Sequence, residues 1–218
     1  MIPVIHADDQ VVVVNKPSGL LSVPGRGPEK QDCVWHRVQA QFADALVVHR
    51  LDQATSGLLV LARGVESQRR LSRAFADRRV DKRYLAWVTG LPPAPTDAPG
   101  WNRIDLPILP DWPNRPRQII SPEGRPCLTY WRRLEHQTSP DRALLELQPH
   151  TGRSHQLRVH LQAIGHPILG DDLYGSDQAP ASPALQLHAW QLTLPHPFED
   201  RTLTLQAPLP PHWGEIAS

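Results

Sequence analysis

The chain has 218 residues, 40% of them hydrophobic, and its formal net charge is +1. This length and composition suffice for a hydrophobic core, built as one large domain or as two small lobes that share a sheet. The longest apolar runs are far shorter than the roughly 18 residues of a membrane-spanning helix, and the N-terminus lacks the basic-then-apolar order of a signal peptide, so we expect a cytoplasmic protein with no membrane association.

The first quarter of the chain predicts strands with one helix between them. Residues 2–16 predict two short strands around an Ala-Asp-Asp turn, and the motif KPSG at residues 16–19 ends the second strand. Residues 33–42 have helical spacing, and residues 46–52, LVVHRLD, predict a return to a strand. The apolar run GLLVLA at residues 57–62 predicts a further, buried strand.

The middle of the chain predicts a basic helix, a strand and a proline-rich connection. Residues 65–79 have the pattern of a basic helix with Leu71 and Phe75 on one face. Residues 83–90 alternate as a strand does. Residues 91–116 contain eight prolines, which predicts a long surface excursion with at most short edge strands.

The last part of the chain predicts more strands around one helix. Residues 126–135 and 142–149 have strand patterns, and residues 151–165 predict a helix that Thr151 caps. Residues 185–210 predict two strands around a Pro-Phe-Glu-Asp turn. Because most strands follow one another through hairpins, the sequence predicts an α+β fold with a mixed, largely antiparallel central sheet flanked by helices and loops.

The small net charge conceals an uneven distribution. Residues 1–133 contain 19 Lys and Arg against 13 Asp and Glu, whereas residues 134–218 contain 4 against 9. The excess is greatest between Arg63 and Arg83, in and around the predicted basic helix. Such a surface can neutralise phosphates and attract a polyanion, although a solvated helix face has the same composition.

One acidic residue lies where chemistry is expected. Asp52 follows an apolar strand and precedes the small polar loop QATSG, so it lies where a strand end opens into a cleft across the sheet. A carboxylate in that place carries a large desolvation cost unless a cation or hydrogen-bond donors keep it ionised. The alternative is a turn-capping aspartate ahead of Thr55 and Ser56.

Two further residues could complete a site with Asp52. Arg153, in the first turn of the predicted helix, opposes the helix dipole by about 0.3 to 1 kcal/mol unless a carboxylate faces it, and Asp52 is the natural candidate. The alternative is an arginine that extends into solvent. Tyr84, at the start of a strand, either packs in the core or offers a flat ring on which a base stacks, with a hydroxyl for proton transfer.

The sequence predicts neither disulfides nor a metal. Cys33 and Cys127 are too few for a disulfide framework and form no CxxC pair, so we expect reduced thiols. His155 and His160 are five residues apart on the predicted helix and therefore diverge.

Several motifs together resemble the RluA family of pseudouridine synthases. They are HRLDQATSGLLVLA, KRY at residues 82–84 and TGRSHQLRVHLQAIGHPILGD, with KPSGLLSVPGR near the start and LHAWQLTLPHP near the end. The resemblance covers residues 2–213, and the order and spacing of separate motifs argue strongly against chance agreement.

The resemblance implies a role for each matching residue. Asp52 matches the family's essential aspartate, and Arg153 the arginine that pairs with it. Tyr84 matches the tyrosine that stacks on the target uracil and takes part in moving the proton from C5. Arg50 matches the residue that enters the RNA stack where the target base has left. The reaction turns uridine into its isomer, so the resemblance implies no cofactor.

The resemblance also implies the domain organisation and the partner. Many family members carry an S4 RNA-binding domain ahead of the catalytic domain, but KPSG begins at residue 16 here, so we expect one catalytic domain over residues 1–218 without an S4 domain. This feature, with SVPGR and DWPNRP at residues 22–26 and 111–116, is most similar to members that modify both 23S rRNA and the anticodon stem-loop of tRNA. We expect a monomer without an obligatory protein partner, in which phosphates contact Arg69, Arg70, Arg73, Arg115 and Arg117.

Two other functions remain as alternatives at this stage. A non-catalytic RNA-binding or chaperone module on the same scaffold would bind RNA without isomerising it. A carboxylate glycosidase would require a second acidic residue near Asp52, where the motifs supply an arginine. The sequence also leaves open whether Asp52 attacks C1′, adds to uracil C6 or removes a proton from C2′.

Overall fold

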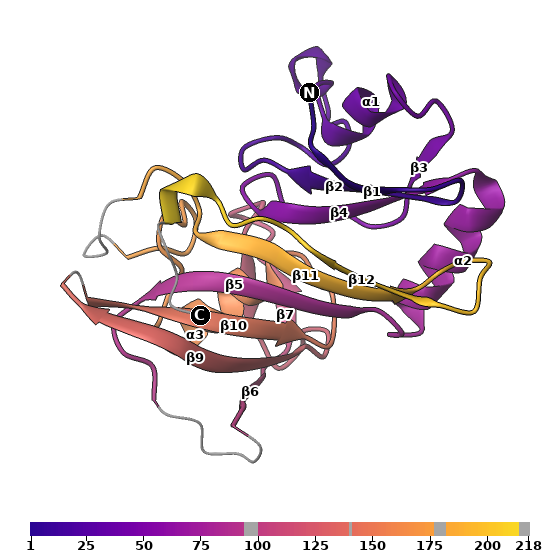
Figure 1. The fold of residues 1–218 in the computed structure, drawn as a ribbon. Helices are drawn as coiled ribbons and strands as arrows, with labels where there is room; N and C mark the ends of the chain where they lie inside the picture. The colour runs from indigo at the N-terminus through magenta and orange to yellow at the C-terminus, as the bar shows by residue number, and fades with distance from the viewer. Residues whose placement is uncertain (94–99, 140, 177–181, 214–218) are drawn as a thin grey trace. The chain divides into compact units, whose positions relative to one another are not determined.

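The computed structural model describes residues 1–93, 100–139, 141–176 and 182–213 (Figure 1). The chain forms two compact units. The first unit comprises Met1–Lys82 and the segment that begins at His188, and the second unit runs from Arg83 to Leu187. The expectation of one catalytic domain stays a prediction. No helix of the described residues is long and apolar enough to cross a membrane.

The first unit is a mixed sheet with helices beside it (Figure 1). Its strands follow the order β1-β2-β4-β11, with β3 paired to β4 and β12 to β11. The β4–β11 pair is parallel, and the other pairs are antiparallel. The bounds are β1 Val4–Ala7, β2 Val11–Lys16, β3 Ala45–Val47, β4 Ser56–Arg63, β11 Leu187–Pro195 and β12 Thr202–Gln206; the helices are η1 Pro28–Lys30, α1 Val34–Gln39, α2 Val65–Ala76 and η2 Pro211–Trp213.

The core of the first unit explains its uninterrupted apolar runs. Residues 11–14 of β2 and 58–62 of β4 are buried along their whole length, because these strands are covered on both faces. Leu71 and Ala74 of α2 pack into the same cluster as these strands. The predicted basic helix and its inward face are therefore confirmed. The helix ends at Ala76 rather than Arg79, because Arg78 has a φ of 57° and leaves the helical conformation.

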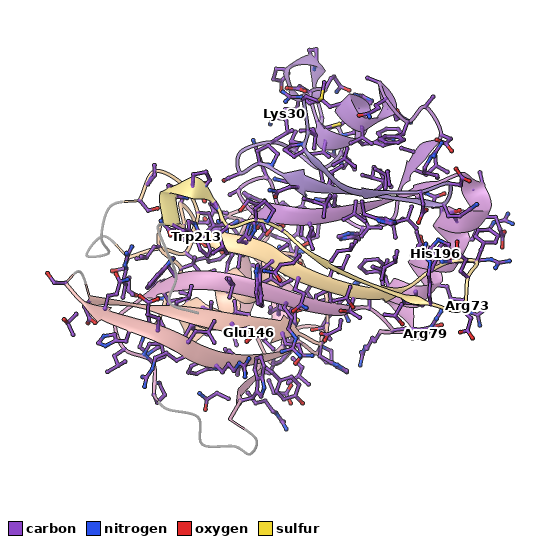
Figure 2. All side chains as sticks on the ribbon, in the orientation of Figure 1. Lys30, Arg73, Arg79, Glu146, His196 and Trp213 are labelled. Carbon is purple, nitrogen blue, oxygen red and sulfur yellow. The ribbon has the colours of Figure 1, made fainter. Side chains whose placement is uncertain are left out.

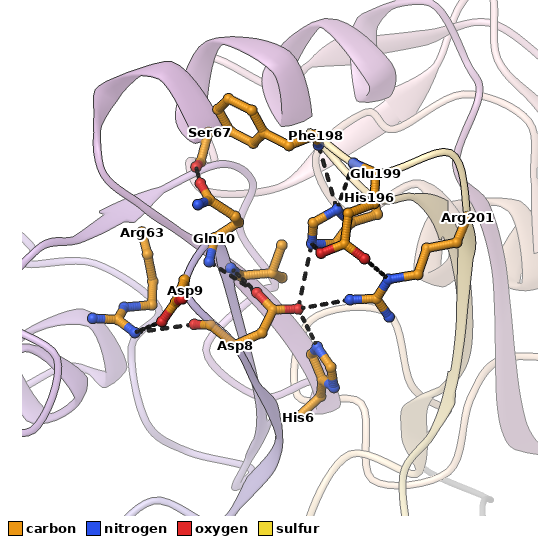
Figure 3. A network of polar contacts seen from close by, with 11 residues as sticks. His6, Asp8, Asp9, Gln10, Arg63, Ser67, His196, Phe198, Glu199 and Arg201 are labelled. Atoms are coloured by element: carbon orange, nitrogen blue, oxygen red, sulfur yellow. Dashed lines mark hydrogen bonds and ion pairs between the residues drawn. The ribbon is translucent and has the colours of Figure 1, made fainter.

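A polar network joins the β1–β2 turn to the β11–β12 turn (Figure 3). The carboxylate of Asp8 accepts the backbone N–H groups of Gln10 and Val11, both at 2.8 Å. The same carboxylate also contacts three basic side chains: His6 at 2.8 Å, Arg201 at 3.3 Å and His196 at 3.4 Å. Burial alone would raise the pKa of Asp8, but the backbone donors and His6 lower it to about 2.

The second unit is an antiparallel sheet with one helix and a separate hairpin. Its sheet has the order β5-β10-β9-β6, and β7 pairs with β8. The bounds are β5 Asp81–Thr89, β6 Asn102–Asp105, β7 Ile108–Pro110, β8 Gln118–Ile120, β9 Leu128–Thr138, β10 Asp141–Pro149 and α3 Gln156–Ala163. The short β6 and β7 fit the expectation for the proline-rich segment, part of which, residues 94–99, lies outside the described residues. The two units together confirm the α+β class with a mixed, largely antiparallel sheet.

Helix α3 begins later than the sequence pattern indicated. Its first residue is Gln156, and Thr151 does not cap it. The side-chain oxygen of Gln156 accepts the hydroxyl of Thr151 at 2.8 Å and the backbone N–H of Arg153 at 3.1 Å, which holds residues 151–155 in a turn ahead of the helix. The helix ends before Gly165, which has a φ of 84°, as expected for a glycine that terminates a helix.

Candidate active site

The chain around Asp52 is a loop and not a strand. Strand β3 ends at Val47, so the prediction of a strand over residues 46–52 is wrong beyond that point. We call residues 48–55 the Asp52 loop. Within it, Leu51 is buried, whereas Arg50 is exposed and Asp52 partly exposed. The two polar side chains therefore flank a residue that anchors the loop in the core.

The Asp52 loop leaves the strand conformation because its backbone bonds to the KPSG segment. Lys16, the last residue of β2, is fully buried. Its ammonium group donates to the backbone oxygens of Pro17 at 3.0 Å, Gln53 at 2.8 Å and Thr55 at 2.7 Å. All three protons of a lysine ammonium thus have an acceptor. Lys16 thus fixes the Asp52 loop from its buried side.

Serine hydroxyls and backbone groups complete this anchoring. Ser18 donates to the oxygen of Ala54 at 2.6 Å. The hydroxyl of Ser22 donates to the oxygen of Leu51 at 2.7 Å and accepts its N–H at 3.1 Å. The backbone N–H of Gly19 donates to Gln53 at 2.9 Å. The second half of the loop is therefore bonded to residues 29 to 39 positions earlier in the chain.

Lys16 also places a basic group near Asp52. Burial lowers the pKa of Lys16 to about 7, and the negative charge of Asp52 opposes that shift. The sequence pattern predicted Arg153 as the basic partner of Asp52. It did not predict that Lys16, Ser18 and Ser22 bind the Asp52 loop. A signal was present, because a lysine that directly extends the apolar strand VVVVN must either be exposed or find buried acceptors.

His49 attaches the start of the Asp52 loop to β4 and α2. Its Nε2 accepts the backbone N–H of Val60 at 3.0 Å, and its ring stacks on Phe75 with centroids 4.5 Å apart. Burial, assisted by the charge of Lys82, lowers the pKa of His49 to about 3. His49 is therefore neutral at physiological pH and positions the loop.

Gly57 follows the Asp52 loop and allows β4 to approach β11 closely. Its φ is 107°, and a Cβ at this position would lie 2.3 Å from the backbone oxygen of Ala189. No other residue type fits such a contact. Next to it, the hydroxyl of Ser56 lies 2.9 Å from Nδ1 of His188. These contacts determine where the Asp52 loop ends.

The other two predicted catalytic residues belong to the second unit. Tyr84 lies on β5 opposite Leu147 of β10 and is partly exposed. Arg153 is exposed in the turn that precedes α3, so it does not occupy the first turn of a helix, and the dipole argument for it was wrong. The pairing of Arg153 with Asp52 stays a prediction.

The basic helix exposes its arginines unequally. Arg69 and Arg73 are 76% and 80% exposed, and within the described residues their acidic contacts are long: Arg69 lies 3.7 Å from Glu66, and Arg73 lies 3.5 Å from Asp77. Arg70 bonds to Glu66 at 2.9 Å, and its guanidinium stacks on Phe198 at 4.2 Å. Figure 2 shows Arg73 directed outward from α2. Arg69 and Arg73 are thus better available to phosphates than Arg70.

The two predicted arginines of the proline-rich segment each contact an aromatic ring. The guanidinium of Arg115 lies 3.1 Å from the centre of the Trp112 ring. That of Arg117 lies 5.5 Å from the centre of Tyr174. In the described part of the chain, no group of three or more His, Cys, Asp or Glu side chains is arranged to hold a metal ion.

Comparison with known proteins identifies the class of this protein. Residues 10–163 match the model of a family described as RNA pseudouridylate synthase. This range is more than half of the chain and contains Asp52, Tyr84 and Arg153. The chain belongs to this family and is an RNA pseudouridine synthase, an isomerase that modifies RNA.

Individual relatives agree with the family assignment. Two curated relatives are both named dual-specificity RNA pseudouridine synthase RluA. The relative from Escherichia coli K12 is 47% identical over 207 residues, covering 94% of this chain and 92% of the relative. The relative from Vibrio vulnificus is 46% identical over 199 residues, covering 89% and 78%. The structure of human RNA pseudouridylate synthase domain containing 1 matches with a TM-score of 0.77 and 27% identity, covering 96% and 84%. These matches confirm the resemblance seen in the motifs and do not favour a non-catalytic module.

Proposed function

We propose that this enzyme isomerises specific uridines in two kinds of RNA, 23S rRNA and the anticodon stem-loop of tRNA. It would act in the cytoplasm as a monomer, without a cofactor or an obligatory protein partner. One observation carries the catalytic part of the proposal. Asp52 is partly exposed on a loop in which the buried Lys16 side chain donates to the backbone oxygens of Gln53 and Thr55. The dual specificity is supported by the names of the relatives that match over most of the chain.

The reaction needs access to the base and control of a detached ring. The bond between N1 and C1′ breaks, the uracil turns, C5 bonds to C1′, and the proton on C5 is lost while N1 gains one. A base in a folded loop must first leave its stack, which costs a few kcal/mol. Arg50, exposed beside Asp52, would fill the vacated place with its planar guanidinium and offset part of that cost.

Asp52 would provide the carboxylate that assists cleavage of the glycosidic bond. It could attack C1′ as in a retaining glycosidase, add to C6 of uracil, or remove a proton from C2′. Each route requires an ionised carboxylate, and the Lys16 amino group interacts electrostatically with that of Asp52. Arg153 would orient the carboxylate, and Tyr84 would stack on the uracil and take part in moving the proton from C5.

The proposed chemistry is tested by tritium release from RNA labelled at C5 of uracil. The wild-type protein, without metal or nucleotide, should release tritium, and Asp52→Asn should reduce the rate by about 10² to 10⁴-fold. Asp9→Asn is the matched control, because the Asp9 side chain is 99% exposed in the β1–β2 turn of the same unit. Equal rates for Asp52→Asn and the wild type would refute the role of Asp52.

The proposed targets require a separate experiment. Pseudouridines are mapped in total RNA from a strain that lacks the gene and from the same strain with the gene restored. The proposal expects restored sites in both 23S rRNA and tRNA anticodon loops. Restoration in only one RNA would refute the dual specificity and leave the isomerase activity intact.

A further inference from the structure

The loop between β7 and β8 presents an aromatic side chain to solvent. We call residues 111–117 the Trp112 loop. Trp112 is 65% exposed, and Phe198 at 46% is the other exposed Phe, Trp or Tyr side chain of the described residues. Covering this apolar surface with a ligand would contribute roughly 25 cal/mol per Å² of buried area.

Arg115 occupies one face of the Trp112 ring. Its guanidinium carbon lies 3.1 Å from the ring centre, which is direct stacking. Since Trp112 remains 65% exposed with one face covered, the exposed area must include much of the opposite face. We call this pair the Trp112 shelf: the guanidinium of Arg115 covers one face of the indole ring, and the other face is open to solvent.

The Trp112 loop is ordered by its own hydrogen bonds, so the exposure of Trp112 does not reflect a lack of structure. The backbone N–H of Asp111 donates to the oxygen of Arg117 at 3.0 Å, which closes the loop. Within it, the N–H of Asn114 donates to the oxygen of Asp111 at 3.1 Å, and the N–H of Arg117 donates to the oxygen of Asn114 at 3.0 Å. Such a preorganised surface loses little conformational entropy on binding a ligand.

The base of the Trp112 loop is bonded to the segment that carries Arg153. The backbone N–H of Gln118 donates to the hydroxyl oxygen of Tyr174 at 2.7 Å. The same hydroxyl lies 2.8 Å from Nδ1 of His155, two residues after Arg153. Tyr174 is only 1% exposed and is therefore a rigid link. The Trp112 shelf thus has a defined position relative to a residue that we place in the catalytic site.

The charges around the shelf favour a polyanion with flat, unpaired rings. Arg115 and Arg125 are exposed, and Arg117 is partly exposed. The carboxylate of Asp111, in the same loop, accepts a hydrogen bond from the side-chain amide of Asn114 at 3.0 Å. A protein partner would be expected to meet a broader apolar patch than one indole. A single-stranded nucleic acid combines phosphates for the arginines with bases that stack on aromatic rings.

We propose that the Trp112–Arg115 pair is a stacking platform for one unpaired base of the RNA substrate, other than the uridine that is isomerised. This inference rests on the proposed function, because it assigns a recognition element to the same RNA. The platform would require an unpaired base at a defined position of the RNA. Contacts between the arginines of α2 and phosphates would not depend on the base sequence.

The platform is tested by RNA binding, measured as fluorescence anisotropy of a labelled stem-loop RNA with uridines in its unpaired loop. Trp112→Leu removes the flat ring and should raise Kd about tenfold, whereas Trp112→Tyr should stay within about twofold of the wild type. Leu134→Ala is the matched control, because Leu134 is 45% exposed on β9 of the same unit. All variants change exposed side chains and should keep the thermal midpoint of the wild type.

A second set of RNAs identifies the stacked base. Each unpaired base of the loop is replaced in turn by an abasic nucleotide. One replacement should weaken binding to the wild type about tenfold and have no further effect on Trp112→Leu. Unchanged affinity of Trp112→Leu would overturn the proposal, as would equal losses for this variant on the stem-loop and on a fully paired duplex.

Failure of the proposed function would look different. If the wild type released no tritium but Trp112→Leu still lost affinity for the loop RNA, the catalytic proposal would fall and the platform would stand. If the wild type isomerised uridine and Trp112→Leu bound RNA as tightly as the wild type, only the platform would be refuted.

Discussion

The Asp52 loop and the Trp112 loop are both irregular, but they are held in opposite ways. The Asp52 loop is bonded from beneath, by the buried Lys16 and by serine hydroxyls that come from a distant part of the chain. The Trp112 loop is closed by its own backbone and touches the rest of the second unit mainly at its base, through Tyr174.

This difference agrees with the tasks that we propose for the two loops. A reacting carboxylate must be placed to within a fraction of an ångström, and only a loop with supported backbone groups can meet that demand. A surface that binds an unpaired base needs order but tolerates small displacements. We therefore expect substitutions below the Asp52 loop to reduce the reaction rate, and substitutions in the Trp112 loop to reduce RNA affinity.

The largest loss of stability is expected from the ion pair that supports Tyr174, at the base of the Trp112 loop. Arg158 donates to the buried Asp171 at 2.6 and 2.7 Å, and Asp171 accepts the N–H of Tyr174 at 2.9 Å. Arg158→Met leaves a buried carboxylate without its cation and should lower the free energy of unfolding by about 3 to 5 kcal/mol. Urea denaturation measures this. A variant as stable as the wild type would show that Tyr174 needs no such support.

The contrast between the two loops is tested most directly at Lys16, which supports the Asp52 loop. Lys16→Met removes the amino group that bonds to backbone oxygens of the Asp52 loop and should lower the free energy of unfolding by about 1 to 3 kcal/mol at pH 8. The rate of tritium release should fall at least about tenfold with little change in RNA affinity, because the Asp52 loop loses its support. Lys30→Met, on the exposed η1 segment, is the control. A variant with the wild-type rate would contradict the supporting role of Lys16.

The lowered pKa of Lys16 predicts a dependence of stability on pH. Its pKa is about 7 in the folded protein and 10.5 ordinarily, so between these values the unfolded chain binds more protons. The stability contribution is therefore complete above pH 10.5, declines as pH falls from 10.5 towards 7, and is lost once pH has fallen through 7. The stability of the wild type relative to Lys16→Met should rise by about 3 to 5 kcal/mol between pH 7 and 10.5. A constant difference would mean that the pKa of Lys16 is not lowered.

A smaller effect is expected at the turn network of Asp8, whose described contacts include no residue of the Asp52 loop. Its pKa of about 2 is below the usual 3.8, so its contribution is complete above pH 3.8 and is lost as pH falls through 2. Asp8→Asn should lower the free energy of unfolding by about 1 to 2 kcal/mol at pH 7, allowing for solvent screening. Tritium release should be unchanged. A reduced rate would show that the turns also influence the Asp52 loop.

The smallest effect per residue is expected on α2. The double variant Arg69→Gln and Arg73→Gln removes two exposed charges and should reduce the slope of log affinity against log salt by about 1 to 2. Lys30→Gln is the control for a charge outside this helix. Since phosphate contacts do not distinguish bases, the loss should be similar for stem-loop and duplex RNA. An unchanged slope would remove α2 from the RNA-binding surface.

The pattern of residues was sufficient for much of the fold. β2, β4 and the amphipathic α2 followed from apolar runs and periodicity, because those signals are local and the core of the first unit needs them. The tail hairpin followed from alternation around a turn. The family followed from motifs spread along the chain, and with it the candidate residues Asp52, Tyr84 and Arg153.

In two segments the secondary structure differs from the local sequence pattern, because side chains elsewhere bond to the backbone. LVVHRLD has a strand pattern, yet the chain leaves β3 at Val47, because Ser22 and Lys16 bond to the backbone beyond it. The helix predicted from Thr151 begins at Gln156, because the Gln156 side chain binds the preceding turn.

The sequence by itself determined most of the strands, the amphipathic helix, the family and the identity of the candidate carboxylate. Only the tertiary structure decided that the KPSG segment, which has the pattern of a strand end, supports the Asp52 loop. The physical reason is that buried backbone groups must find hydrogen-bond partners wherever the fold brings them, and partners about 35 residues apart leave no periodic signal in the sequence.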